Sequence, residues 1–233
     1  MKSIDHRIGV LLSAGGAAFV RAALLSGLDP ATFFVIADRE CGAEESCADA
    51  GIPCRRIPYS ERRSFSHQVA TAFREEGCKI ALLHYSRLVT PDLFGVILTV
   101  NTHPSLLPAY PGLDGVGDAY KANSLFQGAT LHIVDEGIDT GNPIVQTIRP
   151  VPKGASLQWR NRLGFIQKTI VTLFLFDMAA QGRINIQRRD ISAFDLSGLV
   201  PGEFSNPGFP NPGTPAAVKQ LFSELPANAD WTG

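Results

Sequence analysis

Between residues 8 and 180, short apolar runs alternate with longer segments in which apolar residues recur at helical spacing. The first run, residues 8–12, contains no polar residue, which is typical of a strand buried on both faces of a sheet. The runs predict strands at residues 8–12, 33–37, 54–57, 79–84, 96–102, 129–134 and 144–148. The periodic segments predict helices at residues 17–25, 40–50, 65–76, 114–122 and 156–180. We therefore expect an α/β, Rossmann-like fold with a mostly parallel sheet and helices on both faces.

The last fifty residues differ in composition from the rest of the chain. They are rich in Gly and Ser and contain Pro201, Pro207, Pro210, Pro212 and Pro215. This pattern predicts an extended arm or partly ordered tail, with one helical turn at residues 221–225, and not a second domain with its own core. We expect one domain over residues 1–185 and a Pro/Gly-rich C-terminal extension over residues 186–233.

Composition and charge narrow the function classes. A net charge of -1 over 233 residues gives no overall basic surface for nucleic acid. No uninterrupted apolar run reaches the ~18 residues of a membrane span, and residues 1–7 lack the order of a signal peptide. None of the four cysteines forms a C-x-x-C pair. We expect a cytoplasmic protein with reduced thiols, no metal site and neither nucleic-acid nor membrane partners.

The candidate chemistry lies at two predicted strand ends. Asn101 and His103 alternate on one strand, so their side chains share a face, and Asp139 follows in a loop between Gly137 and Gly141. An amide, an imidazole and a carboxylate form a working set for acyl transfer: an oxyanion donor, a proton shuttle and a group that orients the shuttle. The alternatives are an Asn cap, a hydrogen-bonded structural histidine and an ordinary Asx turn.

Two further features allow a functional and a structural interpretation. The turn Ser13–Gly16 joins a strand to a helix, where backbone N–H groups can bind an anion, or it is merely a tight turn. His132 lies within a predicted strand as a core histidine or as a supporting residue of the site. The remaining histidines, which carry no motif, are interpreted as structural: His6, His67 and His84.

Three consecutive segments resemble the folate-dependent formyltransferase family in order and spacing. They are Asn-Thr-His-Pro-Ser-Leu-Leu-Pro-Ala-Tyr-Pro-Gly at 101–112, Gly-Ala-Thr-Leu-His at 128–132 and Asp-Glu-Gly-Ile-Asp-Thr-Gly at 135–141. The resemblance covers roughly residues 7 to 182. Upstream segments 35–39, 50–53 and 85–91 agree best with the glycinamide ribonucleotide branch of that family. It implies that residues 1–185 form a formyltransferase catalytic domain.

The resemblance implies formyl transfer from 10-formyltetrahydrofolate to an amine, without a metal or a covalent enzyme intermediate. Asn101 and a protonated His103 would stabilise the tetrahedral oxyanion, while Asp139 would orient His103 and relay a proton. The implied folate-binding residues are Ser86, Arg87, Leu88, Val89, Asp135, Glu136 and Gly137, acting largely through backbone hydrogen bonds. The implied acceptor-binding residues are Ser13, Gly15, Gly16 and Tyr110.

The acceptor side departs from the glycinamide ribonucleotide pattern. Ala17 and Ala18 replace the Ser or Thr and the Asn that grip a phosphate, and residues 113–118 replace a His-Thr-His-Arg-like run. A glycinamide ribonucleotide-like acceptor is the default. The alternatives are an amino sugar or specialised-metabolite amine, a 10-formyltetrahydrofolate hydrolase and a non-catalytic folate-binding module. A methionyl-tRNA enzyme would need a second, basic domain. The oligomeric state stays open, with a homodimer as one alternative.

Overall fold

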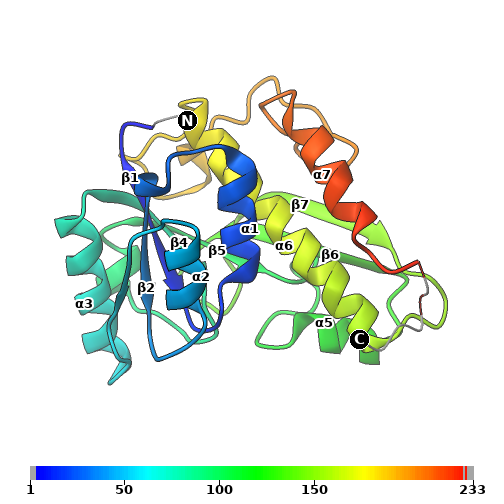
Figure 1. Ribbon diagram of the computed structural model, residues 1–233, viewed down its shortest axis with the longest axis horizontal. Coiled ribbons are helices and arrows are strands. Elements are labelled where there is room, and N and C mark those ends of the chain that lie inside the picture. Colours follow the sequence, from blue (N-terminus) through cyan, green and yellow to red (C-terminus); the bar gives the residue numbers. More distant parts are fainter. Residues whose placement is uncertain (1–3, 228, 230–233) are drawn as a thin grey trace.

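The computed structural model describes residues 4–227 and 229, and it is built on a seven-stranded sheet (Figure 1). Residues 1–3, 228 and 230–233, the ends of the two predicted segments, lie outside the described residues. The strands are β1 (Arg7–Leu12), β2 (Phe33–Ala37), β3 (Cys54–Arg56), β4 (Cys78–His84), β5 (Leu98–His103), β6 (Phe126–Ile133) and β7 (Pro143–Pro150). Their spatial order is β3-β2-β1-β4-β5-β6-β7.

The sheet is parallel from β3 to β5, whereas β6 pairs antiparallel with both β5 and β7, so that β6 alone runs in the opposite direction. The five parallel strands match strands that the sequence predicts, and β1 and β2 are almost completely buried, whereas the edge strand β3 is mostly exposed. The mostly parallel sheet is thereby confirmed. A short loop joins β6 directly to β7, which an antiparallel pair allows, whereas the chain between β5 and β6 includes a further helix at residues 115–121.

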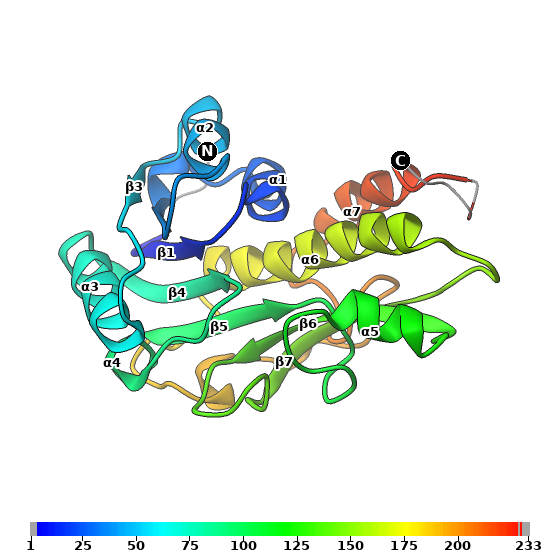
Figure 2. The same cartoon turned by 90° about the horizontal axis from the view of Figure 1, so that it is seen from below.

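Helices cover both faces of the sheet, as predicted (Figure 2). One face carries α1 (Ala17–Ser26), α2 (Ala43–Asp49) and α6 (Leu157–Ala180), and the other carries α3 (Arg62–Glu75) and α4 (Pro91–Phe94). A further helix, α5 (Gly115–Lys121), packs against α6. Phe19, Phe33 and Phe176 form the centre of the larger core, with ring centroids 4.8 to 6.2 Å apart.

Helix α6 is the central helix of the fold. It begins where the Ser156 hydroxyl accepts a hydrogen bond from the Trp159 amide at 3.1 Å, which caps the first turn. Buried residues occur along nearly the whole length of the helix, as expected when the sheet, α1 and α7 pack against it from several sides. By length and composition alone α6 could cross a membrane, but most of its apolar stretch is buried inside the protein, like a core helix.

The C-terminal segment packs against the main domain. Its helix α7 (Thr214–Ser223) is longer than the single predicted turn at residues 221–225 and begins before it, with Pro215 in its first turn. Val218 and Leu221 are buried against the larger core, and Phe204 joins the same cluster. The Asn206 backbone exchanges two hydrogen bonds with Gln146 and so pairs with the outer edge of β7.

Candidate active site

The order of the parallel strands reverses between β1 and β4, which is where α/β sheets bind ligands. The loops that follow these two strands meet there. The Ser13 hydroxyl lies 2.8 Å from the Ser86 hydroxyl and accepts the Ser86 backbone N–H at 3.1 Å. Two segments that the sequence assigned to different ligands therefore meet at the same edge of the sheet.

Four polar side chains gather at the adjoining end of β5. Asp139 Oδ2 lies 3.3 Å from His103 Nδ1, and Asp139 Oδ1 accepts from the Asn101 amide at 3.4 Å. The amide nitrogen of Asn101 also lies 3.2 Å from His132 Nε2. The structure thus brings together the three residues expected from the sequence and adds His132, the residue for which the sequence left a supporting role open.

Strand pairing explains how these residues meet. Asn101 stands opposite His132 in the antiparallel register of β5 and β6, so their side chains lie on the same face. Asp139 follows β6 in a tight loop and itself has a φ of 54°, the left-handed conformation that Asp adopts more readily than most residues. Any side chain at Gly141 would collide with the Ile133 carbonyl, because a Cβ there would lie 1.8 Å from it.

His103 is 3% exposed and lies between two hydrogen-bond acceptors. Its Nε2 lies 2.8 Å from the Tyr110 carbonyl, and its Nδ1 faces the Asp139 carboxylate. Burial lowers the pKa of His103 below its ordinary value, although both acceptors oppose that shift. The ring is therefore mostly neutral near pH 7 without ligands. A neutral ring carries one N–H and can donate to only one of these two acceptors, whereas a protonated ring can donate to both.

Asp139 is ionised and held from three sides. Burial opposes its charge, but the contact with His132, the Gly112 amide at 2.8 Å and the nearby His103 outweigh that cost and lower the pKa of Asp139. The Gly112 bond also fixes the loop that follows Tyr110. Asp139 therefore positions the imidazole and the backbone around it at the same time.

The proton positions of the cluster follow from its partners. His132 Nδ1 lies 2.8 Å from the Ile133 carbonyl and must donate to it, so His132 Nε2 accepts from Asn101. Both hydrogens of the Asn101 amide are then engaged, at 3.2 and 3.4 Å. These bonds are long, so a developing negative charge can compete for one of the hydrogens.

The predicted folate segment after β4 exposes its backbone. Within the part of the chain that the structure describes, the amides of Arg87, Leu88 and Val89 make no hydrogen bond. The Arg87 side chain turns away to Asp38, at 3.2 Å, and stacks on Tyr59. Leu88 is 45% exposed. The segment therefore offers three consecutive donors beside an apolar surface, as a flat heteroaromatic ligand requires.

The second predicted folate segment is a stiff loop. Asp135 Oδ1 accepts from the Gly137 amide at 3.1 Å and from the Thr140 hydroxyl at 2.7 Å. Glu136 is exposed and Ile138 is 54% exposed. This loop and the Ser86–Val89 segment border the same core, because Val134 and Val89 both pack against the cluster under α3 and α4. The folate residues predicted from the sequence thus lie on the α3 and α4 side of the catalytic cluster.

The predicted acceptor residues are less closely associated with one another than the residues of the cluster are. Gly16 precedes α1 with a φ of 66°, and its position against Leu12 leaves no room for a side chain. Gly15 faces open space. Tyr110 contributes its carbonyl to His103, and no hydrogen bond links it to the Ser13–Gly16 turn among the described residues.

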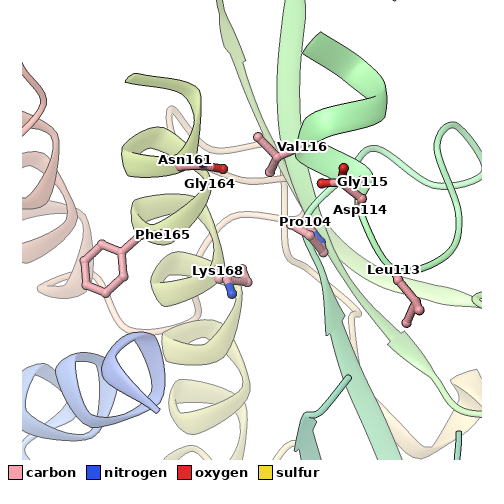
Figure 3. A pocket seen from close by; sticks show the side chains of 9 residues that line it. All are labelled: Pro104, Leu113, Asp114, Gly115, Val116, Asn161, Gly164, Phe165 and Lys168. Carbon is pink, nitrogen blue, oxygen red and sulfur yellow. The ribbon is translucent and has the colours of Figure 1, made fainter. Parts of the chain in front are cut away.

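A cavity of about 230 Å³ lies on the α5 and α6 side of the catalytic cluster (Figure 3). Its lining includes Pro104, Leu113, Asp114, Val116 and Lys168. Lys168 is a residue that the sequence analysis missed. One signal could have identified it, because it is the only charged residue between positions 163 and 176 of an otherwise apolar helix.

The fold and the cluster define an α/β domain equipped for acyl transfer. The chain belongs to the formyl transferase family, whose sequence model matches residues 8–168. It is 34% identical over 153 residues to a phosphoribosylglycinamide formyltransferase of Mycobacterium tuberculosis, covering 61% of this chain and 70% of the relative. The enzyme of the same name from Bacillus subtilis is 42% identical over 91 residues, 38% of this chain and 47% of the relative.

Solved structures agree with the family assignment. Glycinamide ribonucleotide transformylase 1 from Symbiobacterium toebii superposes with a TM-score of 0.71 at 28% identity, over 82% of this chain and 94% of that one. A formyltetrahydrofolate deformylase from Pseudomonas syringae superposes with a TM-score of 0.68 at 20% identity, over 77% of this chain and 63% of that one, and so shares the fold.

Proposed function

We propose that this protein transfers the formyl group of 10-formyltetrahydrofolate to the primary amine of a small, glycinamide ribonucleotide-like acceptor. The observation that carries the proposal is the contact of Asp139 with both Asn101 and His103 at the end of β5. Amide, imidazole and carboxylate within one buried cluster are the groups that formyl transfer to an amine requires. The named formyltransferase relatives support the same reaction.

In the proposed mechanism the acceptor nitrogen attacks the formyl carbon, and the carbonyl oxygen becomes a tetrahedral oxyanion. The Asn101 amide donates to this oxygen by giving up one of its long hydrogen bonds. His103 takes the proton that the amine nitrogen loses, and the imidazolium then donates to both Asp139 and Tyr110. The proton passes to the folate nitrogen as the carbon–nitrogen bond to folate breaks, which restores the neutral ring.

The placement of folate on the α3 and α4 side is part of the proposal. The unpaired amides of Arg87, Leu88 and Val89 and the exposed side chain of Ile138 support it. Asp135 shapes its loop through Gly137 and so acts on folate indirectly. Folate would then approach the cluster from the side opposite the α5 and α6 cavity.

The acceptor assignment rests on the relatives, which are named for phosphoribosylglycinamide. The α1 end of the Ser13–Gly16 turn lacks a side-chain cap, so its backbone amides are open to an anion. Ala17 and Ala18 supply no hydroxyl or amide to such a group, and this observation favours a different amine as the second candidate. We further propose a cytoplasmic enzyme that acts on small molecules, which fits its four free cysteines.

The direct test is a spectroscopic assay of tetrahydrofolate release from 10-formyltetrahydrofolate, with and without glycinamide ribonucleotide. The proposal expects release that depends on the acceptor, together with formylated product. Release without any acceptor would instead identify a hydrolase. Folate binding without release, across a panel of amino sugars and amino acids, would contradict the proposed transfer and indicate a binding module.

A further inference from the structure

The α5 and α6 cavity adjoins the catalytic histidine directly. Pro104 follows His103 in the chain, and a methyl group at Gly115 would lie only 3.0 Å from His103 Nε2. In Figure 3, Lys168 lies on the side of α6 that faces Pro104, while Asp114 and Val116 face it from α5. The cavity therefore lies beside the proposed reacting centre, with Gly115 in the lining next to His103.

Lys168 carries a charge that the protein does not balance. Within the part of the chain that the structure describes, Lys168 forms neither an ion pair nor a hydrogen bond. Burial lowers the pKa of its ammonium, and the same charge helps to lower the pKa of His103 and of His84. A half-buried ammonium without a partner is costly, and an anion beside it would remove that cost.

Asp114, the carboxylate in the cavity lining, already has other partners. Its Oδ1 accepts from the Gly117 amide at 3.0 Å and so caps α5, and its Oδ2 lies 3.6 Å from Lys121. A Cβ at Gly117 would overlap the Asp114 carboxylate, so this cap is closely packed. Asp114 therefore cannot turn toward Lys168 without uncapping the helix.

Building on the proposed function, we propose that this cavity binds the acceptor and that Lys168 holds an anionic group of it, a carboxylate or a phosphate. Lys168 lines this small cavity and Gly115, which also lines it, lies against His103, so the acid group is separated from the amine by only a few bonds. Within the proposed function, this favours the second candidate, a short amine with an acid group, over glycinamide ribonucleotide itself. This subsite is formed by residues 113–116, within the run where the sequence departs from the glycinamide ribonucleotide pattern. It would explain why Ala17 and Ala18 can lack phosphate-binding side chains.

The proposal is tested by calorimetric binding of matched probes to the folate-free protein. The carboxylate pair is glycine against glycinamide, and the phosphate pair is phosphoethanolamine against ethanolamine. A charge-assisted hydrogen bond predicts that at least one probe with an acid group binds about 10- to 100-fold tighter than its partner without one. The pair that shows this preference identifies the acid group.

Variants assign the preference to one residue. Lys168→Met should abolish it, Lys168→Arg should keep most of it, and the exposed Lys219→Met should leave it unchanged. Three results would overturn the proposal: equal binding of the probes with and without an acid group, no binding of either acid-bearing probe at high millimolar concentration, or a preference that persists in Lys168→Met. Since no folate is present, this result is independent of whether formyl transfer occurs.

Discussion

The catalytic cluster and the Lys168 cavity lie on either side of His103, but they differ in whether their polar groups have hydrogen-bond or ion-pair partners. In the cluster, Asp139 contacts Asn101, His103 and the Gly112 amide, and His132 completes the set. In the cavity, Lys168 has no partner within the described chain. The cluster is a finished hydrogen-bond network, whereas the cavity is polar and incomplete.

This difference separates chemistry from recognition. A reaction that recurs on every turnover needs donors and acceptors that are already in place, because reorganising them would add to the barrier. A binding subsite gains affinity from groups that only the ligand completes. The resemblance to the family is strongest where the network is complete, at residues 101–103 and 135–141, and weakest at residues 113–118 beside the cavity.

The largest effect is expected from breaking the completed network. Asp139→Asn keeps the shape but removes the charge that orients His103 and favours its protonated form. We expect kcat to fall by two or more orders of magnitude while the Kd for folate changes little. Steady-state kinetics and a folate-binding titration check this. Turnover like that of the wild type would remove Asp139 from the mechanism.

A second prediction concerns His84, a buried histidine that lies near Lys168 and so outside the catalytic cluster. It bonds Thr172 at 2.9 Å, and burial lowers the pKa of His84 to about 3. As the pH falls below the unfolded value of about 6.5, the unfolded chain binds a proton that the folded chain refuses, so stability is lost down to about pH 3. The slope from this residue approaches about 1.4 kcal/mol per pH unit.

The variant His84→Gln isolates this contribution, because glutamine cannot titrate. Urea unfolding at pH 7 and pH 5 should show that the variant loses roughly 2 kcal/mol less stability than the wild type over that interval. His103 titrates in both proteins and cancels in the comparison. Identical losses in the two proteins would mean that His84 is not held neutral.

A third prediction sharpens the boundary between the two regions. Gly115→Ala places a methyl group 3.0 Å from His103 Nε2 and 3.3 Å from the Pro104 carbonyl, so the imidazole must shift by a few tenths of an ångström. We expect about a tenfold loss of kcat, since small misplacements of catalytic groups are costly. Gly213→Ala, where the added carbon meets only ordinary contact, is the matched control. Equal activity of both variants would show that the boundary tolerates the shift.

The smallest effect is electrostatic. Three charged or titratable groups surround His103: Asp139 and His132 from the β6–β7 side, and Lys168 from α6. Lys168→Met removes a charge that lowers the pKa of His103, so the acid limb of the kcat/KM profile should move to higher pH. The pH–rate profile of the variant measures this, and an unmoved limb would place Lys168 outside the reach of the imidazole.

Local patterns anticipated most of the fold. The apolar runs that became β1, β2 and β4 are buried on both faces, so their hydrophobicity needs no partner to be recognised. The turn at residues 221–225 was placed too late, because the buried face of α7 depends on α6, far away in sequence. The division at residue 185 stays a prediction.

The candidate site divides in the same way. Asn101, His103 and Asp139 were predicted from motif and spacing, since the first two lie at the end of β5, Asp139 follows β6, and these two strands are paired neighbours. The sequence did not predict the neutral state of His103, because burial is a property of the folded chain. Lys168 was missed because its sequence neighbours mark a core helix and say nothing of the cavity beside it.

The sequence by itself determined which elements form, which groups carry the chemistry and which family the chain resembles. These depend on residue types and short spacings, which the chain displays directly. Only the tertiary structure decided that His132 joins the cluster, that Asp114 is spent on capping α5 and that Lys168 stands unpaired beside His103. Burial and partnership depend on residues distant in sequence, and they set the charge and the free hydrogen-bonding capacity of each group.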